Sequence, residues 1–240
     1  MKHQSITMMV AAYNEEKHLR HAVVELDKVL KALFQDYEIL IFDDHSTDRT
    51  GQIADDLAKQ YPAVKVIHNK KNRGLGYNYR RAVQLAKKEY FSIIPGDDAI
   101  KSSSIRRILR DIGKADMIIP FTANTQVRPL LRRIISRLFT GTLNLLFGLK
   151  LKYYNGIVVH KTKLIKKIRM STDSFAYQAE ILIKLIRRGC TYKEVPMYIN
   201  VEEKTSMFRF KNILGVVLTI LRMFFNIRII GIFNKERALR

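Results

Sequence analysis

EILIFDD, residues 38–44, is the clearest of four short apolar stretches that decide the fold. The other three are SITMMVAA (5–12), AVKVIHN (63–69) and YFSIIPGDD (90–98). Runs of this kind, bounded by polar and turn residues, are typical of strands buried on both faces. The intervening segments predict helices, the first of them marked by apolar residues at a spacing near 3.6; they cover 15–34, 50–60 and 76–88. This alternation predicts an α/β fold with a doubly wound, mainly parallel sheet.

Polar side chains follow three of these strands at the point where each strand ends. The clusters are Tyr13-Asn14-Glu15, Asp43-Asp44-His45-Ser46 and Gly96-Asp97-Asp98. One such cluster alone reads as readily as a turn or a helix cap. Three clusters at the carboxyl ends of parallel strands indicate a ligand site, because those ends meet at one edge of the sheet. An oxygen-rich site without clustered His or Cys favours Mg²⁺ or Mn²⁺, shared with a diphosphate.

The composition is that of an ordinary globular protein. The 240 residues are 47% hydrophobic and 27% charged, which excludes a disordered or fibrous chain. The single cysteine, Cys190, excludes an intrachain disulfide framework and a Cys-rich zinc site. The first residues lack the apolar core of a secretory signal, and no 18-residue stretch is free of charge. We therefore expect neither a signal peptide nor a conventional membrane span.

The formal net charge of +21 is concentrated in the second half of the chain. Residues 1–120 carry 20 basic and 16 acidic side chains, whereas residues 121–240 carry 23 and 6. A positive charge of this size predicts an anionic partner. Nucleic acid, acidic lipid headgroups and a phosphorylated substrate all fit, and composition alone does not choose among them.

Two amphipathic helices are predicted in the basic half, over 128–148 and 211–226. Each has a narrow polar edge that recurs about every four residues, and a wide apolar surface between. A single helix of this kind is best read as a core helix. Two of them among so many cations favour helices that lie in a membrane interface, with apolar faces in the acyl region and cations at the headgroups.

Seven motifs along the chain resemble those of the family 2 glycosyltransferases, which have the GT-A fold. Within that family the sequence looks most similar to the dolichol- or polyprenyl-phosphate sugar synthases. The motifs are VAAYNEEKHL (10–19), ILIFDDHSTDRT (39–50), NRGLGYNYRRAVQLA (72–86), IIPGDDAI (93–100), RRIISRLF (132–139), YNGIVVHKTKL (154–164) and FAYQAEILIKLIRRGCTYKEVPM (175–197). The resemblance covers about residues 5–200.

The resemblance implies a nucleotide-sugar pocket at the strand ends. Asp43 would contact the ribose or the base, and Asp44 and Ser46 would shape the turn behind it. Arg73 lies in a loop that reads equally as a phosphate contact or a solvated turn. The residues expected to bind the nucleotide sugar are Ala11, Tyr13, Asn14, Glu15, Ile41, Asp43, Asp44, Ser46, Arg73, Gly96 and Asp97.

The segment PGDD (95–98) aligns with the Asp-x-Asp motif of the family. Gly96 stands where the family has its first Asp, Asp97 is the middle residue, and Asp98 is the expected metal-ligating end. We expect Asp98, with Asp97, to hold Mg²⁺ or Mn²⁺ and to serve catalysis by neutralising the departing diphosphate.

The acceptor side is expected in the basic half. A lipid monophosphate acceptor is largely ionised at neutral pH and needs cations to position it, and Arg holds phosphate oxygens bidentately. Candidate phosphate-binding residues are Arg128, Arg132, Arg133 and Lys204. The same arginines read equally well as headgroup contacts. A hydroxyl acceptor would need a general base instead. Glu180, at a predicted helix start, is the candidate for that catalytic role, or it orients an active-site loop.

We therefore expect a GT-A domain over 1–205, with a nucleotide-binding half (1–100) and an acceptor half (101–205), followed by a basic, membrane-associating tail (206–240). The expected activity is inverting transfer from a UDP-, GDP- or dTDP-sugar to a polyprenyl phosphate at the cytoplasmic face of a membrane. One alternative is a hydroxyl acceptor on a glycan or glycolipid. A more distant one is a non-catalytic nucleic-acid-binding protein, although nucleic acid is not an expected partner. A membrane-protein partner and a homo-oligomer stay open as further alternatives.

Overall fold

The computed structural model describes residues 4–200 and 210–225, the latter by backbone alone up to residue 216. The strands are β1 (Ser5–Ala12), β2 (Asp36–Asp43), β3 (Val64–His68), β4 (Tyr90–Pro95), β5 (Met117–Thr122), β6 (Val159–Lys161) and β7 (Tyr192–Met197). The α-helices are α1 (Leu19–Leu33), α2 (Thr50–Gln60), α3 (Leu75–Leu85), α4 (Ser102–Leu109), α5 (Leu130–Phe147), α6 (Thr162–Ile165), α7 (Tyr177–Arg187) and α8 (Phe210–Met223). A short 3-10 turn, η1 (Thr125–Val127), precedes α5.

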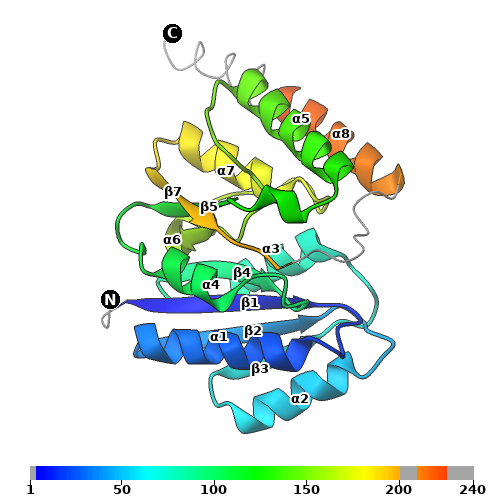
Figure 1. Ribbon diagram of the computed structural model, residues 1–240, viewed down its shortest axis with the longest axis vertical. Coiled ribbons are helices and arrows are strands. Elements are labelled where there is room, and N and C mark those ends of the chain that lie inside the picture. The colour runs from blue at the N-terminus through cyan, green and yellow to red at the C-terminus, as the bar shows by residue number, and fades with distance from the viewer. Residues whose placement is uncertain (1–3, 201–209, 226–240) are drawn as a thin grey trace.

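One mixed sheet runs through the molecule (Figure 1). In the described part of the chain it has seven strands in the order β3-β2-β1-β4-β6-β5-β7. Strands β1 to β4 are parallel, β6 is antiparallel to both of its neighbours, and β5 pairs with β7 in parallel. The expected α/β fold with a mainly parallel sheet is therefore confirmed.

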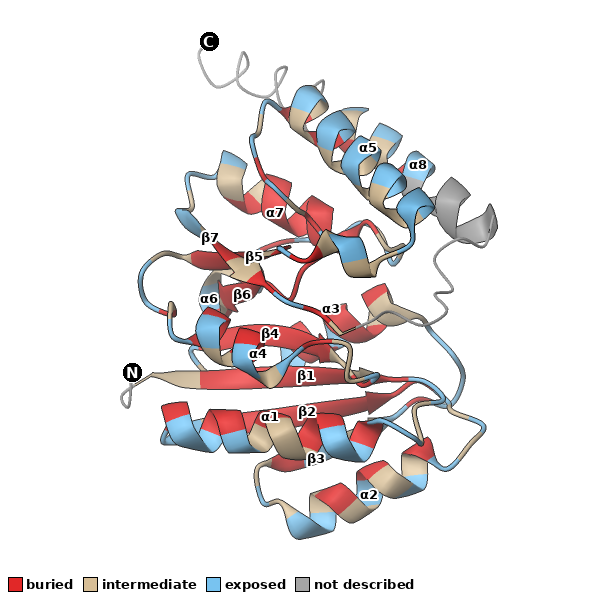
Figure 2. Ribbon diagram, viewed as in Figure 1, coloured by how far each residue is buried: buried red, intermediate tan, exposed pale blue. Residues whose placement is uncertain are grey.

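The sheet is covered on both faces because its strands are apolar on both sides. Residues of β1 alternate between two clusters: Met8 and Val10 pack with α1, α2 and α4, whereas Met9 packs with α3, α5 and α7. Figure 2 shows the strands buried between helices whose outer faces are exposed. At ~25 cal/mol per Å² of apolar surface, this two-sided burial is the main source of folding free energy.

Helices α5 and α8 lie side by side at one end of the molecule, away from β1–β3 (Figure 1). Leu143 and Phe147 anchor α5 in the core, and Met223 does the same for α8. Phe139, Leu146, Ile220 and Phe224 are partly buried against the same core cluster. Exposed large apolar residues on or next to these helices, where side chains are described, are Leu130, Leu131, Ile134, Ile135, Leu138, Leu145, Val217, Leu218, Leu221 and Phe225. Within the residues described, no helix has the length and apolar character needed to cross a bilayer.

The boundaries predicted from the sequence agree with the structure to within a few residues, and the helix over 50–60 agrees exactly with α2. Predicted helix 128–148 corresponds to α5 and predicted helix 211–226 to α8. Lys204 and the proposed boundary at residue 205 lie outside the described residues. The interfacial role of α5 and α8 stays a prediction.

Candidate functional site

The polar clusters after β1, β2 and β4 meet at one edge of the sheet, as expected, because these three strands are neighbours. A cavity of about 430 Å³ opens there. Carboxylates line it on the side of the strand ends, from Glu15, Asp44 and Asp97. Cations line the opposite side, from Arg128 at the end of the β5–α5 connection and Arg132 in the first turns of α5. The cavity therefore has an acidic wall and a basic wall.

The loops after β1 and β2 are tied together by Asn14. Its side-chain oxygen accepts a hydrogen bond from the Thr47 backbone N–H at 2.8 Å, and the Asn14 backbone N–H donates to Ser46 Oγ at 3.0 Å. Asn14 has a φ of 57°, a conformation that Asn tolerates better than most residues. This junction fixes the exposed ring of Tyr13, which lines the cavity.

Asp43, at the end of β2, is held from two sides. Its Oδ1 accepts from the Ser46 amide at 3.0 Å, and its Oδ2 lies 2.9 Å from His68 Nδ1. His68 Nε2 in turn lies 3.0 Å from Asp55 Oδ1. Burial raises the pKa of Asp43, but the hydrogen bonds from Ser46 and His68 outweigh it and leave that pKa lowered. Asp43 is thus a preorganised carboxylate at the carboxyl end of β2.

Asp44, the next residue, holds the start of α3. Its carboxylate accepts from the Arg73 and Gly74 amides, each at 2.8 Å, and from Asn69 Nδ2 at 2.7 Å. Gly74 has a φ of 81°, which favours glycine at this turn. The Arg73 guanidinium stacks 4.3 Å from the centre of the Tyr77 ring and does not line the cavity.

Glu15 and Asp97 place negative charge in the cavity. Burial, together with the charges of Asp97 and Asp48, raises the pKa of Glu15 to about 7. Burial also raises the pKa of Asp97 above its ordinary value. Carboxylates clustered in this way favour a bound cation, which would relieve their repulsion.

Asp98 points elsewhere. Its Oδ2 lies 2.8 Å from His21 Nδ1, and it borders a shallow depression beside α1 and α4 instead of the main cavity. The preceding Gly96 donates its amide to the Ala11 carbonyl at 2.8 Å, and a Cβ at Gly96 would come within 3.0 Å of that same oxygen. Tight packing of this turn against β1 explains why glycine occupies the position.

Residues 7–174 match the family model described as Glycosyl transferase family 2. The chain belongs to this family.

Relatives of this family 2 chain include the glycosyltransferase GlyG of Streptococcus pneumoniae, 32% identical over 46% of the chain and 36% of GlyG. The dolichol-phosphate mannosyltransferase of Pyrococcus furiosus is 27% identical over 75% of the chain and 52% of that protein. The chain spans about a third of the length of the first curated relatives it matches, 30% to 36% for three of them.

Among solved structures, the glucosyl-3-phosphoglycerate synthase of Mycobacterium tuberculosis has a similar fold. Its complex with Mn²⁺, UDP-glucose and phosphoglyceric acid superposes with a TM-score of 0.71 at 14% identity, over 92% of this chain and 80% of that one. At this identity the likeness shows the fold alone.

The acidic wall of the family 2 chain fits a divalent cation completed by a ligand. In the described residues no three His, Cys, Asp or Glu side chains form a closed metal cage. Asp97, with Glu15 nearby in the same cavity, offers the one or two carboxylates that Mg²⁺ commonly takes, leaving substrate phosphates and water to complete the shell. Asp97 lines this cavity and Asp98 does not, so Asp97 is the better-placed carboxylate, while the metal-ligating role of Asp98 stays a prediction.

The predicted site residues divide into two groups. Those that line the main cavity are Ala11, Tyr13, Glu15, Asp44, Asp97, Arg128 and Arg132. Those that do not are Asn14, Ile41, Asp43, Ser46, Arg73, Gly96, Asp98, Arg133 and Glu180. Ile41 is fully buried in the core of β2, and Asn14, Asp43, Ser46 and Gly96 shape the loops behind the lining. Arg133 lines a second cavity, next to the first.

Glu180 is completely buried on α7 and faces away from the cavity. Both of its oxygens accept from the Ser171 amide at 3.0 Å, and Oε1 also accepts from the Ser171 hydroxyl and from Lys184. These contacts fit the second of the two roles predicted for Glu180, because they hold the loop that leads into α7.

Several lining residues carry no role in the sequence-based prediction. They are Asn78, Tyr153, Asn155, Phe175, Tyr177, Gln178 and Asn200. Two of the motifs quoted above, YNGIVVHKTKL and FAYQAEILIKL, contain four of them, and this was the available signal. Buried His160 lies behind Gln178, 3.4 Å from its side-chain nitrogen, and burial lowers the pKa of His160 to about 3. A neutral imidazole therefore backs this wall.

Proposed function

We propose that this family 2 chain transfers a sugar from a nucleotide-sugar donor to a polyprenyl phosphate, with inversion, at a membrane surface. The donor diphosphate would lie along the acidic wall, where Asp97 would hold Mg²⁺ or Mn²⁺. The metal would offset the negative charge that develops on the departing diphosphate. Structural neighbours solved in complex with UDP and Mn²⁺ or Mg²⁺ support this choice of cofactor.

The basic wall favours a phosphate as the acceptor. Arg128 and Arg132 line the cavity there, and the other lining residues on that side that the structure describes, Tyr153, Asn155 and Gln178 among them, include no Asp, Glu or His. A hydroxyl acceptor needs a base to remove its proton, and the carboxylates that line the cavity in the described part of the chain belong to the acidic wall. A phosphate monoester is already ionised and needs only cations to position it. This division of charge is the observation that carries the proposal.

The exposed apolar residues of α5 and α8 support a membrane surface as the place of reaction. Figure 2 shows much of the outer side of α5 as exposed, and Arg132 of the same helix lines the main cavity. A polyprenyl chain could then stay in the acyl region while its phosphate reaches the basic wall. The similarity to the dolichol-phosphate mannosyltransferase of Pyrococcus furiosus adds support.

Donor turnover tests the proposal. The purified chain in mild detergent would receive UDP-, GDP- and dTDP-sugars with Mg²⁺ or Mn²⁺, with and without polyprenyl phosphate. Release of nucleoside diphosphate that requires the lipid phosphate, the metal and Asp97 is expected. Transfer to a glycan or glycolipid hydroxyl, with no response to the lipid phosphate, would replace the acceptor. Absence of turnover with every donor and acceptor, from folded protein, would overturn the proposal.

A further inference from the structure

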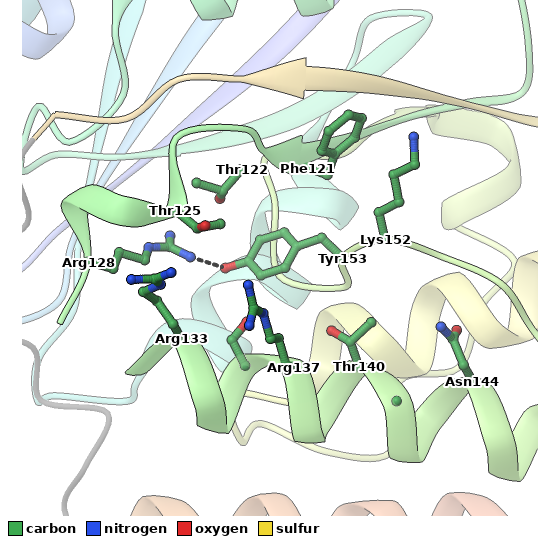
Figure 3. Close-up of a pocket in the computed structure, with 12 residues that line it drawn as sticks. Phe121, Thr122, Thr125, Arg128, Arg133, Arg137, Thr140, Asn144, Lys152 and Tyr153 are labelled. Atoms are coloured by element: carbon green, nitrogen blue, oxygen red, sulfur yellow. Dashed lines mark hydrogen bonds between the residues drawn. The ribbon is translucent and has the colours of Figure 1, made fainter. Parts of the chain in front are cut away.

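A second cavity of about 360 Å³ lies next to the main one, between α5 and the segment that leads from β5 into α5 (Figure 3). Arg128 and Tyr153 line both cavities. The Arg128 guanidinium donates to the Tyr153 hydroxyl at 3.2 Å, so this pair forms the wall between them. The second cavity has the size of a small ligand site.

Its lining is strongly basic. Arg133, Arg137 and Lys152 join Arg128 there, and none of the described residues that line it is acidic. Figure 3 shows Arg133 and Arg137 rising from α5 toward Tyr153. Within the described residues, no Asp or Glu forms an ion pair with Arg133, Arg137 or Lys152. Cations gathered in one cavity repel each other unless an anion lies between them.

One donor in this cavity is both buried and unsatisfied. Arg133 Nε is shielded from solvent and has no hydrogen-bond partner among the residues described. A buried donor left unpaired costs about 1–3 kcal/mol, more for a charged group, so such groups are rare without a ligand or water. The guanidinium offers this N–H beside its other donors, which is the geometry that binds a phosphate or carboxylate bidentately.

Neighbouring contacts hold the cavity open. The Lys152 amide donates to Glu194 Oε1 at 2.7 Å, and its ammonium lies 4.4 Å from the centre of the Phe121 ring. Asn144 bonds the Leu151 backbone through both side-chain atoms, at 2.9 and 3.1 Å, and closes the far end. The lining hydroxyls of Thr125, Ser136 and Thr140 remain as further donors. These contacts brace the cavity walls, and hydroxyls and cations are among the residues that line the cavity.

We propose that this second cavity binds a phosphate ester, through Arg133, Arg137 and Lys152, at a site separate from the donor diphosphate and from the acceptor phosphate at Arg132. The site goes beyond the proposed transfer reaction, since binding here requires neither metal nor turnover. A phosphate ester could come from a membrane-lipid headgroup, because the same helix, α5, also carries exposed apolar residues, or from a soluble molecule.

Equilibrium binding without metal tests this site. Inorganic phosphate would be titrated into the full chain in EDTA, and vesicles of phosphatidylcholine with or without phosphatidylglycerol would be used in a parallel series. The double variant Arg133→Gln/Arg137→Gln removes two cations from the cavity, and Lys152→Gln is a milder change. Arg132→Gln removes a cation from the main cavity. Arg20→Gln/Arg110→Gln, exposed on α1 and after α4, matches the charge change of the double variant.

The double variant should weaken phosphate binding, or the added binding to phosphatidylglycerol vesicles, at least tenfold, and Lys152→Gln should weaken it several-fold. Arg20→Gln/Arg110→Gln should bind nearly as the native chain does, whereas Arg132→Gln should lose the phosphate bound in the main cavity and keep the binding at the second cavity. A loss confined to vesicles would identify a lipid headgroup, and a loss confined to inorganic phosphate a soluble ester. Equal binding by the native chain and both cavity variants, whether or not Arg132→Gln loses binding, would overturn the proposal. Urea unfolding checks each fold, and donor turnover measured in parallel separates failure here from failure of the transferase proposal.

Discussion

His21 Nδ1 lies 2.8 Å from Asp98 Oδ2, and this contact holds the Asp98 carboxylate outside the main cavity. Asp97, the residue before it, lines that cavity. The two carboxylates diverge because Asp98 has a φ of 54°, which turns the chain sharply after β4. Asn200 Nδ2 secures the turn by donating to the Asp98 carbonyl at 2.8 Å. The two adjacent aspartates therefore line different cavities.

Asp97→Asn should lower turnover about a hundredfold or more. The change removes a negative charge from the acidic wall, where we place the metal, and metal-based charge stabilisation is worth several kcal/mol. Nucleoside diphosphate release at saturating donor, with Mg²⁺ or Mn²⁺ titrated, measures the loss of rate and of metal affinity together.

Asp98→Asn is the matched control. Asn tolerates a positive φ and can still contact His21, so turnover should stay within a few-fold of the native rate. If Asp98→Asn lost as much activity as Asp97→Asn in a folded protein, the metal assignment would have to return to Asp98.

Glu180→Gln should act on stability and not on the chemical step. The carboxylate is buried, accepts from Ser171 and pairs with Lys184, so the change should lower the free energy of unfolding by about 1–3 kcal/mol. Removal of the whole side chain in Glu180→Ala should cost about 3–5 kcal/mol, because Lys184 loses its buried partner. Urea unfolding measures both values.

The turnover of folded Glu180→Gln should fall less than tenfold, with an unchanged pH profile. A rate reduced more than a thousandfold, with the unfolding free energy intact, would show that Glu180 is a general base. In that case a hydroxyl acceptor would become the better proposal.

His68 should make stability depend on pH in a defined direction. Partial burial lowers its pKa, but the hydrogen bonds to Asp43 and Asp55 outweigh this and raise the pKa above 6.5. A histidine whose pKa is raised by folding stabilises the protein fully below its unfolded pKa, and the contribution disappears as pH rises through the folded value. The native chain should therefore exceed His68→Gln in stability most clearly below pH 6.5.

Urea unfolding of both proteins at a series of pH values gives this difference directly. It should shrink as the pH rises above 6.5. A difference that grows with pH would mean that His68 is neutral in the folded protein and that Asp43 is held in some other way.

The strand ends illustrate what the sequence could predict. Apolar runs followed by Glu15, Asp44 and Asp97 were enough to place these carboxylates on one edge, because parallel strands align their carboxyl ends. The direction of Asp97 and Asp98 was not predictable in the same way. Side-chain alternation stops where β4 ends at Pro95, and the φ of Asp98 then decides which carboxylate faces the cavity.

The other side of the site depends on contacts between distant segments. Antiparallel β6 has three residues, Val159–Lys161, too few to show a strand period, yet it separates β4 from β5 in the sheet. Gln178 and Glu180 are two positions apart on α7, about 200° around the helix, so only one of them could face the cavity. Helical spacing alone does not tell which of the two faces the cavity. The packing of α7 against β6 and against the 169–175 loop decides it.

Thr219 should couple α8 to the acceptor side of the cavity. Its hydroxyl lies 2.9 Å from those of both Thr172 and Ser174, and the next residue, Phe175, lines the main cavity. Thr219→Val keeps the shape but removes the hydroxyl, so the KM for the lipid phosphate should rise several-fold, up to about tenfold or 1.4 kcal/mol, with the donor KM unchanged. Steady-state kinetics with each substrate varied in turn provide the test.

Thr219→Ser retains the hydroxyl and should restore the native acceptor KM. A rise in both KM values, or no rescue by serine, would show that Thr219 only stabilises the fold.

Leu131→Gln/Leu138→Gln should weaken binding to lipid vesicles at least tenfold. The two side chains are 63% and 65% exposed on α5, so the variant should fold with nearly native stability. Burial of a leucine side chain is worth about 1.5–3 kcal/mol, and both would lose that gain at a membrane. Leu85→Gln, at an exposed leucine on α3, is the control and should bind as the native chain does. Cosedimentation with phosphatidylglycerol vesicles gives the affinities.

Equal binding by all three proteins would assign the attraction to the charge of the second half alone. Added salt should then release the protein, because exposed charges are screened within about 10 Å at 0.1 M salt.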